Sequence, residues 1–184
     1  MPESASSRPW LAGEGRRIYL WNHFHHPTER AGIGKWHRFP CFMPDVISRE
    51  VKGCHQDDVR GVLLCGIGTQ PDYYLNMRTA FNVEADYQVL VTAFLSRIFG
   101  AASEPMERFC CRISKINREE GVIGTTREAS WLRLGTEERM KELGGYVDEA
   151  VMLVTTDLER KRVDTWREGV WEYMKTGRDQ FHAK

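Results

Sequence analysis

The chain has 184 residues, of which 41% are hydrophobic and 11% aromatic, a composition typical of a folded globular protein and unlike that of disordered chains. Its 26 Lys and Arg residues equal its 26 Asp and Glu residues, so no overall positive charge points to nucleic acid as the partner. Five irregularly spaced cysteines and the lack of a charged-then-apolar leader predict an intracellular protein with free thiols, not a secreted one.

The first part of the chain predicts strands joined by a long loop. Residues 1–16 are expected to form a short flexible leader, and Arg17–Phe24 to form a strand because it is rich in β-forming residues. A stretch punctuated by Gly and Pro follows and predicts a loop. The apolar run Val59–Ile67 and the alternating run Tyr73–Val83 then predict two further strands.

A helix is predicted from the apolar spacing that follows. Its stripe recurs at helical intervals and consists of Tyr87, Leu90, Val91, Phe94, Leu95 and Ile98. Asp86 at its start and Arg97 near its end suit the helix dipole, and Gly100 is placed to end it. None of the apolar stretches reaches the roughly 20 residues of a membrane-spanning helix, so no transmembrane segment is expected.

The second half predicts a similar mixture of strands and helices. Arg108–Ile116 and a segment through Trp131–Leu134 predict strands, and Thr136–Leu143 predicts a helix that Gly144 and Gly145 end. Tyr146–Leu158 predicts a central strand. The last predicted element is a C-terminal helix with apolar residues at helical spacing: Val163, Trp166, Val170 and Met174.

Strands outnumber helices in this prediction, and several connections are too short for a helical crossover. We therefore expect an α+β fold, a mostly antiparallel sheet with helices packed on one face. Residues 17–184 are expected to form a single compact domain.

A zinc site is one interpretation of the histidines and cysteines near the N-terminus. His37 and Cys41, followed by the adjacent pair Cys54 and His55, supply four ligands of the kind that zinc binds tetrahedrally. Only His37 and Cys41 have a close spacing of the usual kind, so the alternative is that these are loop and core side chains. No cofactor other than zinc is expected.

The His-hydrophobe-His stretch His23-Phe24-His25 gives a second metal hypothesis. Alternating side chains on a strand place both imidazoles on one face, as in the metal-binding pair of HUH endonucleases. Those enzymes also need a helical Tyr with a Lys three or four residues later. Here Tyr87 is followed at those positions by Leu90 and Val91.

No catalytic residue is predicted elsewhere. Gly66-Ile67-Gly68 follows a predicted strand but lacks the third glycine of a dinucleotide loop. Neither G-x-S-x-G nor H-E-x-x-H occurs, and no small-molecule substrate is indicated.

Aromatic and basic side chains are interspersed in the first forty residues, where six Lys or Arg face three Glu. Trp and Arg dominate protein-binding hot spots and also suit membrane surfaces. The sequence therefore predicts a binding surface made of Trp10, Arg16, Arg17, Trp21, Arg30, Lys35, Trp36 and Arg38.

The order of elements between residues 73 and 158 resembles that of rhabdovirus matrix proteins, whose chain length is similar. The segments that carry this resemblance are the extended YYLNMRTAFNV, the helix EADYQVLVTAFLSRIFG, the strand MERFCCRISKI, an Arg-rich connection ending in WLRLG, and the strand YVDEAVMLVTTDL.

The resemblance implies a non-enzymatic viral structural protein, found in the virion and in the host cytoplasm or nucleus. Such a protein self-associates and binds a nucleoprotein or another viral protein. It also bridges the nucleocapsid to the inner membrane surface. A zinc-binding regulator or an HUH-type nuclease is the alternative.

Overall fold

The computed structural model describes residues 17–22, 31, 33–64, 70–122 and 126–183. These residues are mostly helical. In chain order the elements are β1 (Tyr19–Asn22), α2 (Pro44–Gln56), β2 (Gly61–Leu64), α3 (Gln70–Phe81), α4 (Tyr87–Phe99), the 3-10 helix η2 (Gly100–Ala102), α5 (Ser103–Glu120), the π-helix η3 (Ala129–Leu134), α6 (Glu137–Leu153), α7 (Asp157–Trp166), the π-helix η4 (Arg167–Glu172) and α8 (Tyr173–His182).

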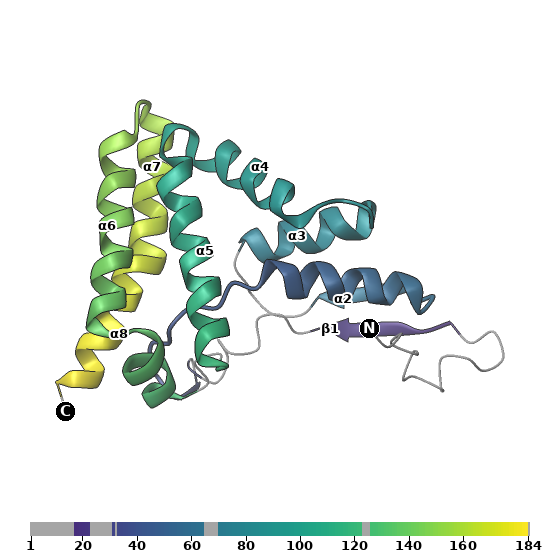
Figure 1. Ribbon diagram of the computed structural model, residues 1–184, viewed down its shortest axis with the longest axis horizontal. Coiled ribbons are helices and arrows are strands. Elements are labelled where there is room, and N and C mark those ends of the chain that lie inside the picture. The colour runs from purple at the N-terminus through teal and green to yellow at the C-terminus, as the bar shows by residue number, and fades with distance from the viewer. Residues whose placement is uncertain (1–16, 23–30, 32, 65–69, 123–125, 184) are drawn as a thin grey trace.

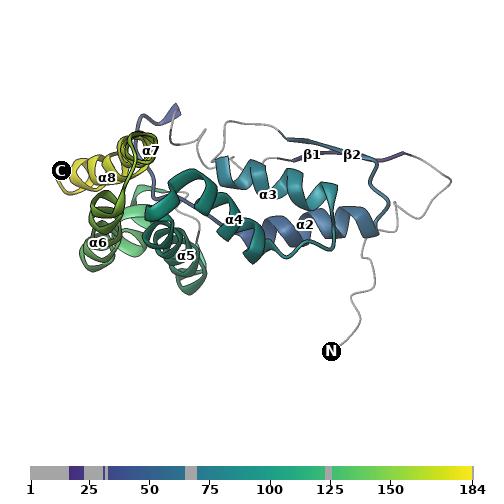
Figure 2. The same cartoon turned by 90° about the horizontal axis from the view of Figure 1, so that it is seen from above.

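The elements form two regions (Figure 1). Helices α5 and α6 stand side by side with the continuous helical run from α7 through η4 to α8. Helices α2, α3 and α4 lie across one side of this bundle. Figure 2 shows β1 and β2 as a separate layer, with α2 and α3 on the same side of both strands.

The prediction of a mostly antiparallel sheet is wrong. In the part of the chain that the structure describes, the sheet consists of β1 and β2 alone, and these two strands are parallel. Four segments predicted as strands or as parts of strands are helical instead: Tyr73–Val83 lies mainly in α3, Arg108–Ile116 in α5, Trp131–Leu134 in η3, and Tyr146–Leu158 mainly in α6.

Helix α5 shows why the prediction failed. Its buried residues include Met106, Phe109, Ile113 and Ile116, spaced three or four apart along one helical face. The window predicted as a strand contains Phe and two Ile, residues that favour strands. Phe109, Ile113 and Ile116 already recur at helical spacing within this window, and burial of their stripe outweighs strand propensity.

Gly144 and Gly145 lie within α6 and do not end it. The Trp171 indole lies so close to Gly144 that a Cβ there would be 3.0 Å from its Cζ2 atom. Gly144 therefore permits close packing between α6 and η4.

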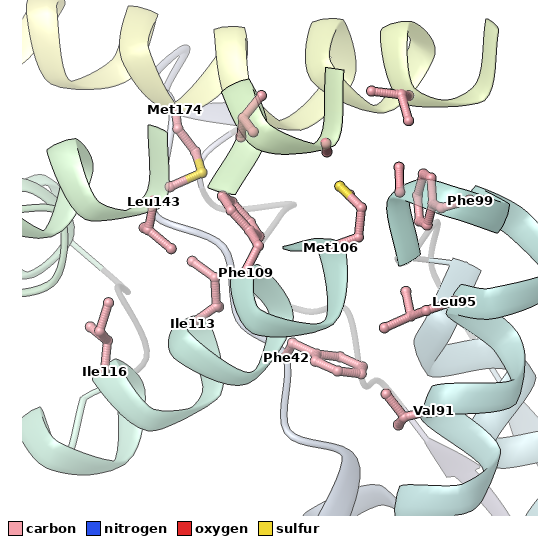
Figure 3. Packing of buried hydrophobic residues seen from close by; sticks show 14 of the residues in the cluster. Phe42, Val91, Leu95, Phe99, Met106, Phe109, Ile113, Ile116, Leu143 and Met174 are labelled. Carbon is pink, nitrogen blue, oxygen red and sulfur yellow. The ribbon is translucent and has the colours of Figure 1, made fainter. Parts of the chain in front are cut away.

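The predicted helix at Tyr87–Phe99 is confirmed as α4. The Asp86 carboxylate accepts a hydrogen bond from the Gln88 backbone N–H at 2.7 Å, and Gly100 caps the other end with a φ of 53°. Leu95 on this helix, Met106 and Phe109 on α5, and Met174 on α8 belong to one buried apolar cluster (Figure 3).

Ion pairs reinforce the contact between α5 and α6. Arg112 Nε lies 2.8 Å from a Glu142 carboxylate oxygen, and Arg139 Nη2 lies 2.8 Å from Glu120 Oε1. Within the described residues, we find no helix with the length and apolar character that crossing a bilayer requires.

Candidate binding surface

The two strands and the helix between them form a β-α-β unit. β1 pairs in parallel with β2, so that Tyr19 lies opposite Gly61 and Trp21 opposite Leu63. Parallel neighbours need a crossover connection, and α2 supplies it. Helix α2 begins at Pro44, which suits a first helical turn, and buries Ile47 and Val51 on its inner face.

One face of this small sheet is exposed to solvent. Tyr19, Trp21 and Leu63 have exposed fractions of 66%, 65% and 57%, and strand alternation places them on the same face. A Cβ at Gly61 would be 3.1 Å from the Tyr19 ring, so this ring lies over the glycine. On the opposite face Leu20 and Leu64 are half-buried. The exposed face, Tyr19, Trp21 and Leu63, is called the apolar sheet face below.

Helix α3 carries a second group of exposed apolar residues. Met77 and Phe81, one helical turn apart, have exposed fractions of 61% and 85%. The buried side of α3 consists instead of Leu75, Asn76 and Thr79 with Asp72. Two apolar surfaces therefore lie on neighbouring elements.

Among the residues that the structure describes, two cations flank the apolar sheet face. Arg17 is exposed just before β1. Arg60 is exposed before β2, and its guanidinium lies 3.2 Å from the Asp58 carboxylate, which balances its charge. Among the described residues, the apolar sheet face and its surroundings therefore carry little net charge.

The structure separates the predicted binding-surface residues into two places. Trp21 lies on the exposed sheet and Arg17 just before it, and Lys35 is exposed in a turn at a φ of 49°. Trp36 is half-buried, and Arg38 is only 5% exposed. The remaining three residues, Trp10, Arg16 and Arg30, lie outside the described residues.

Residues 36–42 attach the sheet region to the helical bundle. The His37 carbonyl accepts a hydrogen bond from Trp131 Nε1 at 2.9 Å, and the Arg38 backbone N–H donates to the Tyr173 hydroxyl at 3.1 Å. The His37 ring lies 4.4 Å from the Tyr173 ring, and its Nδ1 lies 3.2 Å from Gln180 Oε1. Arg38, predicted as part of an open binding surface, and His37, predicted as a zinc ligand, thus have structural contacts with the bundle.

Burial affects the thiols of Cys41, within this segment, and Cys110 on α5. Burial raises the pKa of Cys41 to about 11, an effect that nearby Arg38 opposes and Asp72 reinforces. Burial also raises the pKa of Cys110 to about 12. Both thiols therefore stay protonated at neutral pH and are weak nucleophiles.

The predicted zinc ligands have different surroundings. His37 contacts Tyr173 and Gln180, Cys54 is buried in α2, and His55 is exposed in the last turn of α2. Across the described ranges, no group of three or more His, Cys, Asp or Glu side chains is arranged to hold a metal ion. His23 and His25 fall outside these ranges, and Tyr87 is half-buried at the start of α4.

The sequence prediction missed Tyr19, Leu63, Met77 and Phe81. Alternation within the predicted first strand would have placed Tyr19 beside Trp21. The one-turn spacing of Met77 and Phe81 was hidden because their segment was predicted to be a strand.

No protein-family model, no curated protein and no solved structure matches this chain.

Proposed function

We propose that this protein acts by binding another polypeptide, and that the apolar sheet face is its contact surface. The observation that carries the proposal is the exposure of Tyr19, Trp21 and Leu63 together on one face of the sheet. Large aromatic side chains cost little conformational entropy to immobilise and are enriched in protein interfaces. Contiguous exposed apolar surface of this kind marks an interaction site.

The charge pattern favours a polypeptide over an anionic membrane. Peripheral membrane binding needs a cluster of basic residues beside the apolar anchors. Beside this face, the charge of Arg60 is balanced by Asp58. Among the described residues that flank β1 and β2, this leaves the exposed Arg17 as a single cation and not a basic cluster. Self-association or contact with a nucleoprotein fits the proposal, and a matrix-like role remains one specific prediction within it.

The test compares a double variant with a matched control. Tyr19→Ser with Trp21→Ser removes the aromatic anchors, whereas Met152→Ser removes an equally exposed apolar side chain from α6. Candidate partners are captured with the intact chain from cells that contain it and are then purified. We expect calorimetry to give at least a roughly 100-fold weaker affinity for the double variant and an unchanged affinity for Met152→Ser.

The proposal fails if each purified partner binds the double variant as tightly as the original chain. It also fails if no captured protein binds once purified. Vesicles of phosphatidylserine and phosphatidylcholine provide a further arm. Vesicle binding that is lost at high salt and in Arg17→Ala would identify an anionic membrane in place of a polypeptide.

The zinc alternative is tested by metal analysis of the purified protein before and after a chelator. A structural site predicts close to one zinc per chain and loss of stability on chelation. Less than about a tenth of a zinc per chain eliminates such a site.

A further inference from the structure

A small notch opens on the α8 side of the molecule, whereas β1 and β2 lie on the opposite side (Figure 1). Three segments that are far apart in the sequence contribute to it: the stretch before Phe39, the helical turn that leads into η3, and α8. Its described lining includes Trp36, His37, Arg127, Trp131, Gln180 and Phe181. The enclosed part measures about 10 Å³, which is room for about one water molecule.

The floor of the notch is formed by tight packing between two of these segments and α8. The Trp131 indole N–H donates to the His37 carbonyl at 2.9 Å. At Gly177 in α8, an added Cβ would be 2.4 Å from Trp131 Cζ2 and 2.6 Å from His37 Cβ. A larger residue at position 177 would therefore push the floor apart. The shape of the notch is thus set by the packing of the chain itself.

Arg127 is the one Lys, Arg, Asp or Glu among the described residues that line the notch. Its side chain is half-buried, and its guanidinium has no ion pair or hydrogen bond with another described residue. Arg133, on the same helical segment, has a carboxylate partner at 3.4 Å in Glu120. Arg178 on α8 has one at 3.5 Å in Glu137. A half-buried cation among aromatic rings is partly dehydrated, so an anion beside it interacts more strongly than on open surface.

The lining favours a carboxylate over other anions. The planar guanidinium of Arg127 matches the two oxygens of a carboxylate. His37 Nδ1 lies 3.2 Å from Gln180 Oε1, and because this amide oxygen accepts, the amide nitrogen of Gln180 keeps its two N–H donors. Room for about one water molecule admits a carboxylate oxygen but not a tetrahedral phosphate. Trp36 and Phe181, both half-buried, supply ring surface for the group that carries the carboxylate.

We infer that this notch binds a carboxylate attached to an aromatic ring, with Arg127 as its ion-pair partner and the ring against Trp36 and Phe181. A small aryl acid and the C-terminal carboxylate of a polypeptide that ends in phenylalanine share this chemistry. The notch is separate from the apolar sheet face, so the inference can fail while the proposed function holds, and the reverse.

The probe is phenylacetate, titrated into the isotope-labelled full chain and followed by NMR through the tryptophan indole N–H signals. We expect saturable shifts at Trp36 and Trp131 with a Kd below about 1 mM. The signal of Trp21, on the sheet, should not shift. Phenylacetamide has nearly the same shape without the charge, and it should bind at least about tenfold more weakly.

Three variants test the role of Arg127. Arg127→Gln removes the cation and should weaken phenylacetate binding at least about tenfold. Arg127→Lys keeps the charge without the planar fork, so its affinity should lie between those of Arg127→Gln and the original chain. Arg49→Gln removes an exposed cation of α2 and is the matched control, which should bind within about twofold of the original chain. Circular dichroism and the Trp131 indole signal without phenylacetate confirm that each variant folds.

Three results would overturn the inference: a Kd for phenylacetate above about 1 mM, equal affinity for phenylacetamide, or equal affinity of Arg127→Gln and the original chain. A tripeptide that ends in phenylalanine, compared with its C-terminal amide, distinguishes the two sources of the carboxylate. Binding of the free-acid tripeptide at least about tenfold tighter than phenylacetate, and lost in the amide, identifies a polypeptide C-terminus. Weaker binding of the tripeptide than of phenylacetate identifies a small free acid.

Discussion

Trp131 lies in the helical bundle and Trp21 in the small sheet, and the two indoles differ in their exposure to solvent. Trp131 in the helical bundle is 2% exposed, and its indole N–H donates to the His37 carbonyl. Trp21 on β1 is 65% exposed. The bundle buries the Trp131 indole within the chain, whereas the sheet presents the Trp21 indole to solvent. The bundle tryptophan should therefore contribute to stability, whereas the sheet tryptophan belongs to the surface proposed for a partner.

The largest effect is expected from removing the buried tryptophan. Trp131→Ala leaves a cavity beside Phe39 and Gly177 and leaves the His37 carbonyl without its donor, so unfolding should become easier by about 3–5 kcal/mol. Urea denaturation measures this change. Leu132→Ala, at the exposed neighbouring position, is the control and should stay within about 0.5 kcal/mol. Equal effects of the two substitutions would contradict this account of the bundle.

Two glycines of the helical region should respond with opposite signs. Gly100 has a φ of 53°, and a Cβ there would be 1.9 Å from Glu159 Oε1. Gly100→Ala should therefore cost about 1–3 kcal/mol. Gly145 lies in α6 with no atom within 4 Å of an added Cβ, so Gly145→Ala should stabilise by about 0.5–1 kcal/mol. Thermal unfolding of both variants checks the signs, and destabilisation by both would refute the steric argument.

Glu159 joins the connection between α4 and α5 to the connection between α6 and α7 through hydrogen bonds. Its carboxylate accepts hydrogen bonds from the Thr155 N–H and hydroxyl at 2.8 and 2.9 Å and from the Ala101 N–H at 3.2 Å. The bonds from Thr155, then that from Ala101, lower the pKa of Glu159 from its ordinary 4.5 to about 2. Because the folded-state pKa is depressed, the stabilisation is present above pH 4.5 and is lost as the pH falls toward 2.

Glu159→Gln removes this charge and provides the test. The original chain should be more stable than Glu159→Gln at pH 6, and the difference in unfolding free energy should shrink as the pH is lowered to 3. Urea titrations at several pH values measure this difference in unfolding free energy. The contributions of the other carboxylates are the same in both chains and cancel. A gap that stays constant over this range would show that Glu159 ionisation does not stabilise the fold.

Local patterns predicted part of this fold. The helix at Tyr87–Phe99 and the strand segments within Arg17–Phe24 and Val59–Ile67 follow from periodicity that one segment displays by itself. The parallel pairing of β1 with β2 does not, because it depends on α2, which lies where a loop was predicted. The strand predictions at Tyr73–Val83 and Arg108–Ile116 failed because aromatic and β-branched residues favour strands, whereas the buried residues of both segments recur at helical spacing.

The candidate site was predicted only in part. Arg17 and Trp21 are exposed as expected, but Trp36 is half-buried and the Arg38 backbone bonds to Tyr173 in the bundle. Residue type alone does not distinguish these uses, because Trp and Arg are common both in interfaces and in buried contacts. The deciding information is the position of Trp131 and Tyr173, far along the chain, beside residues 37 and 38.

The smallest effect on stability is expected at the sheet. Trp21→Ala removes a side chain that is already mostly in solvent, so the free energy of unfolding should change by less than about 0.5 kcal/mol. The same change of Trp to Ala is thus expected to cost several times more at Trp131. Urea denaturation of both variants under one set of conditions makes the comparison direct. A loss of more than about 2 kcal/mol at Trp21 would mean that this side chain stabilises the fold, and the surface proposed for a partner would then be part of the core.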